Sequence, residues 1–299
     1  MSRTAVSVAQ FELAADTSFD AFAERVTEVV GAAADQGSGA VLLPELVTTS
    51  LLAARDDREE LRVADLDRVY RAHFPRFTDD LISLYRALAA RHDLVVLGGS
   101  HLRAVGDELR NTALVVFPDG RLVQQDKLHL TPPERAMGIT PGESVETFDI
   151  DGMPCAVQIC ADIEFPEIPR ILASRGVEVI FCPSLTWNTR GSERVRLGAH
   201  ARAMENQMYV VVSTLVHTSG YPRDGAIHGT GNARVAVPLD RTFGKNDGVW
   251  AASPDTRRSA LLSTVIDREI LHASRARPEP PGLRYVRPDL YRSVAEAGR

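Results

Sequence analysis

Lysine is scarce in this sequence of 299 residues: among its 34 lysines and arginines, only Lys127 and Lys245 are lysines. The chain therefore uses arginine wherever a positive charge is enough, and each lysine suggests a chemical need that arginine does not meet. An ammonium group is a compact charge on a flexible stem, whereas guanidinium is a planar fork. The net charge is −6, so the basic surface typical of nucleic-acid-binding proteins is not expected.

Cysteines are few, and their number and spacing exclude two common roles. The three residues Cys155, Cys160 and Cys182 do not suit a disulfide framework, which needs an even number. They form no CxxC pattern and no HxxxH pattern accompanies them, so we expect no metal site. Cys155 and Cys182 lie inside apolar runs and are interpreted as small buried side chains.

Long apolar runs are also lacking. None approaches the roughly 18 residues that a membrane span needs, and the N-terminal segment MSRTAVSVAQF has no apolar region typical of a secretory signal. We therefore expect no membrane partner and place the protein in the cytoplasm, with its thiols reduced.

What is present indicates a globular α/β protein, with 44% apolar and 25% charged residues. Short apolar runs that predict strands alternate with segments whose apolar residues recur at helical spacing, as in residues 4–11 followed by residues 19–30. No repeat or linker interrupts the pattern. We predict one domain over residues 1–299, with an extended arm at about 275–299 that contains several prolines and arginines.

Three predicted strands end at residues with chemical potential: Glu45 after VLLP, Lys127 in QQDK and Cys160 in VQIC. Ligand sites in α/β sheets lie at the carboxyl ends of strands, so these side chains are expected to converge. Partial desolvation would raise the pKa of Glu45 toward that of a general base. The turn after the Cys160 strand would lower the thiol pKa and stabilise an oxyanion. Taken singly, each residue also allows a structural interpretation.

The ordered segments LLPEL, KLHL and ICADIEFPE resemble the three signatures of the nitrilase, or carbon–nitrogen hydrolase, superfamily. The similarity extends over nearly the whole chain, because TPPERAMGITPG, FCPSLTW and AHARAMENQMYVVV also match the pattern in order. FPE after the cysteine resembles the amidase branches, since true nitrilases usually carry a Trp-Glu pair there.

This resemblance implies that Glu45, Lys127 and Cys160 form a catalytic triad and that Glu134, before the PG turn, holds Lys127 and helps to orient substrate. It also implies a four-layer αββα sandwich that dimerises sheet to sheet. The expected function is hydrolysis of a small linear amide through a thioester, without a cofactor. Glu45 moves protons, while Lys127 and the backbone N–H of Ala161 hold the oxyanion.

Substrate contacts are expected after the FCPSLTW strand, where the family builds its pocket. Trp187, Asn188 and Arg190 are the candidates. Trp187 either walls the pocket or packs in the core, and either Arg190 or Arg194 is suited to binding a substrate carboxylate. The Gly-containing loop 218–230 either covers the site or is an ordinary hairpin connection. Linear amides, ω-amides and N-carbamoyl compounds remain open as substrates, and nitriles are less expected.

Two further interpretations compete with this one. A papain-like Cys–His pair is disfavoured because His129, two residues past Lys127, is expected to be packed and hydrogen-bonded. The later histidines His200, His217 and His228 have no Asn or Asp nearby in a sequence context that indicates a catalytic partner. The second alternative is a catalytically idle binding protein on the same fold. An idle binding protein would have no reason to keep the polar side chains of Glu45, Lys127 and Cys160 buried together, because burying them costs free energy.

Overall fold

The computed structural model describes residues 3–279 and 282–297. One continuous sheet carries the strand order β5-β4-β3-β2-β1-β9-β8-β7-β6; β10 and β11 also pair with β9, β12 pairs with β11, and β13 pairs with β1. The strands are β1 (Arg3–Leu13), β2 (Ala40–Leu42), β3 (Val95–Val105), β4 (Glu108–Val116), β5 (Leu122–Asp126), β6 (Thr147–Ile150), β7 (Met153–Val157), β8 (Val179–Ser184), β9 (Tyr209–Thr218), β10 (His228–Gly229), β11 (Arg234–Ala236), β12 (Val249–Ala252) and β13 (Ala260–Asp267).

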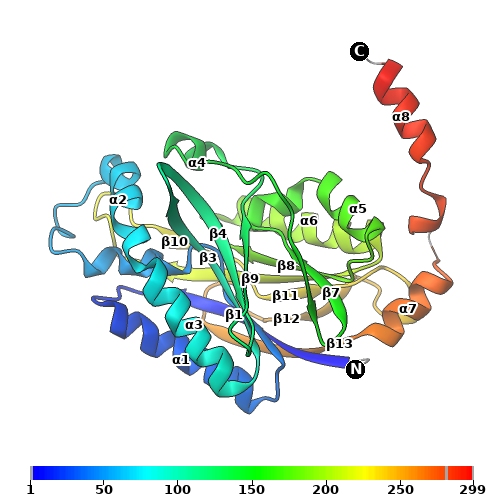
Figure 1. The fold of residues 1–299 in the computed structure, drawn as a ribbon, viewed down its shortest axis with the longest axis horizontal. Coiled ribbons are helices and arrows are strands. Elements are labelled where there is room, and N and C mark those ends of the chain that lie inside the picture. Colours follow the sequence, from blue (N-terminus) through cyan, green and yellow to red (C-terminus); the bar gives the residue numbers. More distant parts are fainter. Residues whose placement is uncertain (1–2, 280–281, 298–299) are drawn as a thin grey trace.

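The helices other than α8 lie around this sheet (Figure 1). They are α1 (Phe19–Asp35), α2 (Leu66–His73), α3 (Thr78–His92), α4 (Pro132–Ala136), α5 (Glu167–Ser174), α6 (Thr189–Asn206), α7 (Arg268–Ala276) and α8 (Pro288–Ala297). Short 3₁₀ helices are η1 (Val47–Ala54), η2 (Val63–Asp65), η3 (Phe74–Phe77), η4 (Cys160–Glu164), η5 (Arg241–Phe243) and η6 (Gly282–Tyr285). In the described ranges, no helix is both long and apolar enough to span a membrane.

Strand β1 joins two halves of the sheet. Its residues 6–8 pair in parallel with β2, whereas residues 10–13 pair in parallel with β9. The alternation of TAVSVAQF gives β1 two apolar faces, so Val8 belongs to one buried cluster and Ala9 to another. The strand thus contributes to the core on both sides of the sheet.

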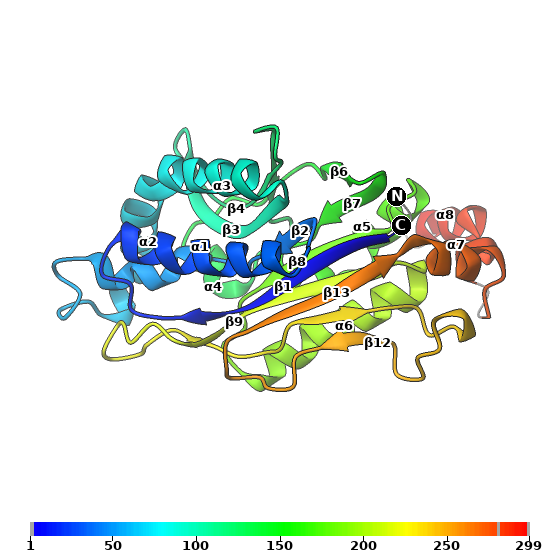
Figure 2. The ribbon, with the colours of Figure 1, turned by 90° about the horizontal axis from the view of Figure 1, so that it is seen from below.

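Helices cover both outer faces of the sheet. Figure 2 shows α1 and α3 on one side of the strands and α6 on the other. Helix α1 begins after Ser18, whose hydroxyl accepts a hydrogen bond from the N–H of Ala21 at 3.1 Å. It buries Phe22, Val26 and Val30, the apolar stripe that the sequence predicts. The arrangement confirms the predicted four-layer αββα sandwich.

The C-terminal segment differs from the rest in its packing. Helix α8 has no buried residue and stands away from the body of the molecule (Figure 1). The predicted arm at 275–299 therefore includes a helix in its described part, rather than being extended throughout. The two halves of the sheet pack on each other within one chain, since residues of β3 share one buried cluster with residues of β7 and β8.

Candidate active site

Four predicted residues meet in one buried cluster. Glu45 lies three residues after β2, Lys127 directly follows β5, Glu134 lies in α4 and Cys160 begins η4 after β7. The Nζ of Lys127 lies 2.7 Å from Oε1 of Glu45 and 2.8 Å from both carboxylate oxygens of Glu134. The Lys127 residue is only 2% exposed. One buried ammonium therefore bridges two carboxylates.

Glu45 is held by more than the lysine. Its Oε1 also accepts a hydrogen bond from the side-chain amide of Asn111 at 3.0 Å, and Asn111 makes a second bond of 3.0 Å to Glu134. Its Oε2 accepts from the backbone N–H of Leu185 at 2.9 Å. Leu185 also presents its carbonyl to the Cys160 thiol at 3.7 Å. A single residue thus contacts both the carboxylate and the sulfur.

The loop that carries Glu45 is fixed by close packing. Leu46 adopts the left-handed region with φ of 48°, a conformation that a non-glycine residue keeps only when its surroundings enforce it. Its N–H donates to the hydroxyl of Ser100 at 3.0 Å. Gly99, at φ of 67°, lies so near that a Cβ there would come within 1.8 Å of the Pro44 carbonyl oxygen. Glycine is required at this approach.

The turn at Cys160 is fixed in a similar way. Cys160 also has a positive φ of 47°. Asp162, which is fully buried, accepts from the N–H of Ile159 at 3.0 Å and from the N–H of His129 at 2.6 Å. This carboxylate joins the cysteine turn to the chain that follows Lys127. Asp162 and Asn111 were missed by the sequence interpretation; the former was visible as the acid in ICADIE, whereas the latter carried no signal.

Burial and charge set the protonation states of the cluster. Burial by itself lowers the pKa of Lys127, but the charges of Glu45 and Glu134 outweigh it and hold this pKa well above its usual range. Burial tends to raise the pKa of Glu134, yet Lys127 keeps it below the usual range. Burial raises the pKa of Glu45 although Lys127 opposes the rise. Glu45 is therefore the carboxylate suited to accepting a proton.

The expectation of a lowered thiol pKa is wrong for the resting protein. Burial, with the charge of Glu45 added, raises the pKa of the Cys160 thiol well above its usual range, and Lys127 opposes this only in part. The turn and its N–H groups are local features, whereas desolvation arises from the whole fold. The sulfur is thus held as a thiol beside a base, not as a stored thiolate.

A cavity of about 220 Å³ opens onto this cluster. Its polar base holds the four cluster residues, and Ala161, Trp187 and Asn188 also line it. Trp187 is 53% exposed, so it walls the cavity instead of packing in the core. The remaining lining residues are Leu46, Tyr70, Thr131, Pro132, Pro133, Met137, Glu164, Leu185, Thr186, Gly191 and Arg194. Arg190 is not among the residues of this lining, whereas Arg194, one helical turn later, is.

Comparison with known proteins places this cluster in a family. A sequence model described as carbon-nitrogen hydrolase matches residues 5–286. The chain belongs to the carbon-nitrogen hydrolase family. The probable hydrolase YhcX of Bacillus subtilis is 33% identical over 287 residues, which cover 96% of this chain but 54% of that protein. The chain therefore spans about half the length of this relative. An omega-amidase of Xenopus laevis is 28% identical over 234 residues, covering 73% of this chain and 79% of the relative.

Solved structures show that this carbon-nitrogen hydrolase chain shares its fold with the nitrilase superfamily. Nit3 of Saccharomyces cerevisiae, a member of branch 10 of that superfamily, matches with a TM-score of 0.74 at 20% identity over 95% of this chain and 97% of that one. A double mutant of the amidase from Nesterenkonia sp. AN1, in complex with acrylamide, matches with a TM-score of 0.75 at 18% identity over 98% of each chain.

His129 is a packed residue of this hydrolase-family site, as the sequence predicts. Its Nδ1 lies 3.0 Å from Oδ1 of Asp162, and its ring stacks on Phe165 with the centroids 3.9 Å apart. His129 is not among the residues that line the catalytic cavity. The papain-like alternative therefore finds no histidine from this motif at the cavity.

The loop 218–230 is a hairpin connection. Strand β10 pairs antiparallel with the end of β9, with Thr218 opposite His228. Tyr221 donates to Glu59 at 2.7 Å, and no residue of the loop lines the catalytic cavity. A separate hollow is lined by Trp187, Asn188 and several residues of this hairpin.

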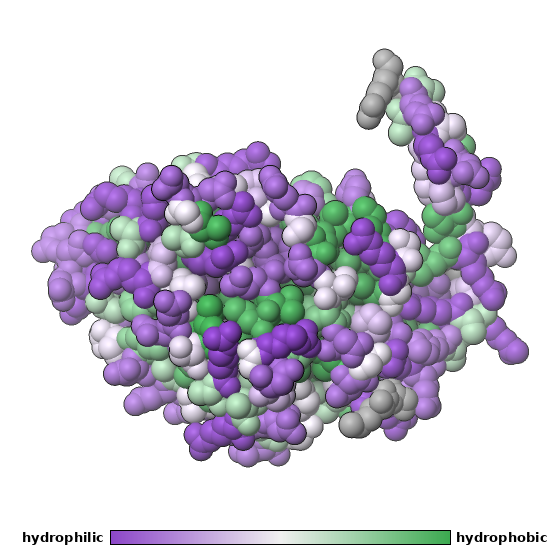
Figure 3. All heavy atoms as spheres, viewed as in Figure 1, coloured by the Kyte–Doolittle hydropathy of each residue, from purple (hydrophilic) through white to green (hydrophobic). Residues whose placement is uncertain are grey.

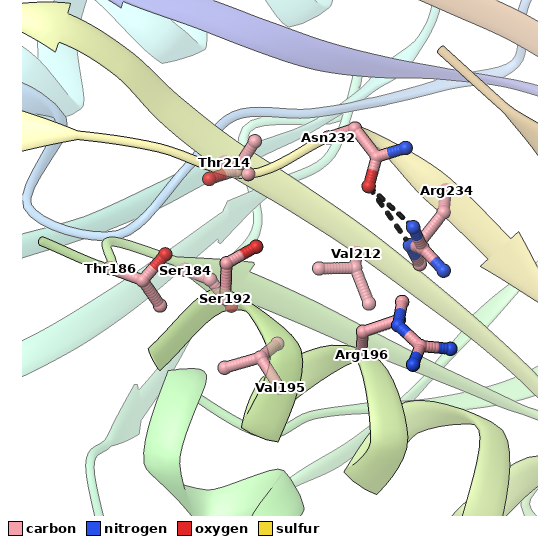
Figure 4. Close-up of a pocket in the computed structure, with 10 residues that line it drawn as sticks. Ser184, Thr186, Ser192, Val195, Arg196, Val212, Thr214, Asn232 and Arg234 are labelled. Atoms are coloured by element: carbon pink, nitrogen blue, oxygen red, sulfur yellow. Dashed lines mark hydrogen bonds between the residues drawn. The ribbon is translucent and has the colours of Figure 1, made fainter. Parts of the chain in front are cut away.

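A third hollow lies behind Thr186, which lines both it and the catalytic cavity. Figure 4 shows the side chains of Arg196 and Arg234 there, with Arg234 bonded to Asn232. Its volume is about 10 Å³, room for roughly one water molecule. No carboxylate or thiol is among the side chains that line it, so the chemistry of nucleophilic attack belongs to the larger cavity.

Proposed function

We propose that the protein is a cysteine-dependent amidohydrolase that cleaves a non-peptide C–N bond of a small linear amide. The observation that carries this proposal is the buried Lys127, which bridges Glu45 and Glu134 in the same cavity as Cys160. A buried charged network is expensive unless it has a use, which disfavours the idle binding protein. The cavity of about 220 Å³ favours a small substrate.

In the first half-reaction, Glu45 takes the proton of the Cys160 thiol while the sulfur attacks the amide carbonyl carbon. The oxygen of the resulting tetrahedral intermediate is stabilised by the ammonium of Lys127 and by the backbone N–H of Ala161 at the start of η4. Glu45 then passes its proton to the departing nitrogen as the C–N bond breaks. Ammonia or an amine leaves, and the acyl group remains on sulfur as a thioester.

In the second half-reaction, water replaces the amine. Glu45 takes a proton from the water, whose oxygen attacks the thioester carbon. The C–S bond breaks, the carboxylic acid leaves, and Glu45 returns its proton to Cys160. Glu134 stays ionised throughout, because Lys127 lowers its pKa, and it keeps the ammonium in place. The raised pKa of Glu45 suits this exchange of one proton between two partners.

Among substrates, amides are favoured over nitriles and N-carbamoyl compounds. Relatives include omega-amidases of Xenopus laevis and Mus musculus, 28% and 29% identical, and an (R)-stereoselective amidase of a Pseudomonas species, 33% identical over 155 residues. The N-carbamoyl alternative uses the same residues with a carbamoyl carbon in place of the amide carbon.

The test is ammonia release from a panel of amides, N-carbamoyl compounds and nitriles, with Cys160→Ala as the blank. The expected result is turnover of at least one amide that disappears in the variant, together with an acyl adduct on the intact protein in mass spectrometry. Turnover that survives the Cys160→Ala substitution would remove the cysteine from the mechanism.

We also propose that the protein forms a homodimer, joined through the outer face of α5 and α6 and not sheet to sheet as the resemblance implies. Apolar residues gather over these helices (Figure 3), and Ile171, Leu197 and Met204 are exposed there. Exposed contiguous apolar residues mark interfaces more often than free surface. Light scattering should give twice the mass of the chain, and Leu197→Glu should return the mass to that of one chain; a monomeric parent protein would refute the dimer.

A further inference from the structure

A second charged pair lines the catalytic cavity, apart from the buried cluster. Arg194 of α6 places its Nε 3.3 and 3.4 Å from the two carboxylate oxygens of Glu164, at the end of η4. The Arg194 side chain is 63% exposed, so this pair lies at the open side of the cavity. Within the lining, the other cation is Lys127, which already bonds to two carboxylates. Arg194 is therefore the cation available to a bound molecule.

Apart from the reactive cluster and this pair, the lining of the cavity is largely apolar. Leu46, Tyr70 and Leu185 are buried and face the cavity, and Met137 joins them. A substrate with its amide carbon at Cys160 would pass a wall that offers apolar contact. Its far end would then reach the polar mouth. The cavity thus fits a molecule with an amide head, an apolar middle and a polar end.

The hydrogen-bonding groups at the mouth of the cavity indicate which charge the far end of the substrate carries. Among the described residues, Arg194 bonds only through Nε, which leaves its terminal guanidinium nitrogens for a ligand. Asn188 uses its side-chain oxygen to cap α6 at the N–H of Gly191, 3.0 Å away, so its amide NH₂ is the part left over. Both Glu164 oxygens already face the arginine. Spare donors exceed spare acceptors, which favours an anion over an ammonium.

Resting on the proposed amidase function, we propose that Arg194 selects amides that carry a carboxylate at the end distant from the scissile bond. The guanidinium holds this carboxylate with its terminal nitrogens in the paired geometry that arginine offers. Glu164 keeps Nε and thereby sets the orientation of the fork. Arg194 is a specificity-determining residue in this proposal and takes no part in the bond-breaking steps.

Binding in a Cys160→Ala background tests the proposal without turnover. Three five-carbon amides serve as probes in calorimetry: glutaric monoamide, glutaric diamide and 5-aminopentanamide, with anionic, neutral and cationic far ends. The monoamide should bind most tightly. Arg194→Gln should weaken it by about 10- to 100-fold, as expected for a hydrogen-bonded charge, and Arg194→Lys should fall between. Arg196→Gln is the matched control, because Arg196 lies on the same helix and pairs with Glu193 outside this cavity.

The active protein supplies the second measurement. Arg194→Gln should lower the ratio of kcat/KM for the monoamide to that for the diamide by about 10- to 100-fold, chiefly through KM. Equal binding of the three probes, or an equal loss for all of them in Arg194→Gln, overturns the proposal. Tightest binding of 5-aminopentanamide, lost in Glu164→Gln, overturns it in favour of a cation. Arg194-dependent binding without hydrolysis of any amide would support anion selection and refute the amidase function instead.

Discussion

Replacing Lys127 by methionine is the sharpest perturbation of the buried cluster. The change removes the one charge that Glu45 and Glu134 share and leaves both carboxylates buried, with Asn111 donating to each. Removing one partner of a buried ion pair costs about 3 to 5 kcal/mol. With a urea slope on the order of 3 kcal/mol per molar, the unfolding midpoint should fall by about 1 to 2 M. Loss of an oxyanion donor should lower kcat at least about 100-fold.

The pH dependence of this loss distinguishes the mechanism from a simple packing defect. In the parent protein, Lys127 depresses the pKa of Glu134, so the stabilisation is present above the unfolded pKa and fades as the pH falls. In the variant, the buried carboxylates have raised pKa values, so they protonate readily and destabilise the fold chiefly at higher pH. The difference in unfolding free energy should thus be largest near pH 7 and shrink toward pH 4.

Urea unfolding at several pH values, with ammonia release as the activity assay, measures both effects. Lys245→Met, at the only other lysine, is the matched control and should change neither. A Lys127→Met protein with near-parent activity, or one whose destabilisation is the same at every pH, would contradict the electrostatic reasoning.

Three other outcomes are expected. Glu45→Gln removes the base, so turnover should fall by about 100- to 10,000-fold, and the melting temperature should fall less than in Lys127→Met because Lys127 keeps Glu134 as its partner; a normal rate in the ammonia assay would exclude the base role. Gly99→Ala should lower the urea midpoint sharply, because its Cβ would collide with the Pro44 carbonyl, and an unchanged midpoint would contradict the packing. Iodoacetamide labelling of Cys160, followed by mass spectrometry, should rise with pH because its pKa is raised, while the two fully buried cysteines resist; equal labelling of all three would refute this.

The sequence predicted the residues at the ends of strands better than their neighbours inside them. Glu45, Lys127 and Cys160 each stand at the end of a predicted strand, and the rule that sites form at the carboxyl ends of strands predicts that they converge. Asn111 lies within β4, where its neighbours are ordinary strand residues. Its hydrogen bonds reach residues 66 and 23 positions away, and no local pattern encodes contacts of that kind.

The sequence could not decide between Arg190 and Arg194 as the arginine that contacts substrate, for a related reason. Helix α6 begins at Thr189, because Asn188 caps it. Which arginine faces the cavity depends on where the turns start, and only the structure distinguishes Arg194, which lines the cavity, from Arg190. The prediction of a lowered pKa for the Cys160 thiol was wrong because desolvation is a property of the whole fold.

Strand β1 joins the two halves of the sheet, and this connection makes the reaction depend on how the halves are packed. Glu45 and Lys127 follow strands of one half, whereas Cys160 and Leu185 follow strands of the other. The gap that a proton must cross between base and sulfur is therefore set by how the halves seat on each other. Substitutions deep in the core, far from any substrate, can therefore change the reaction rate while every residue of the cluster stays the same.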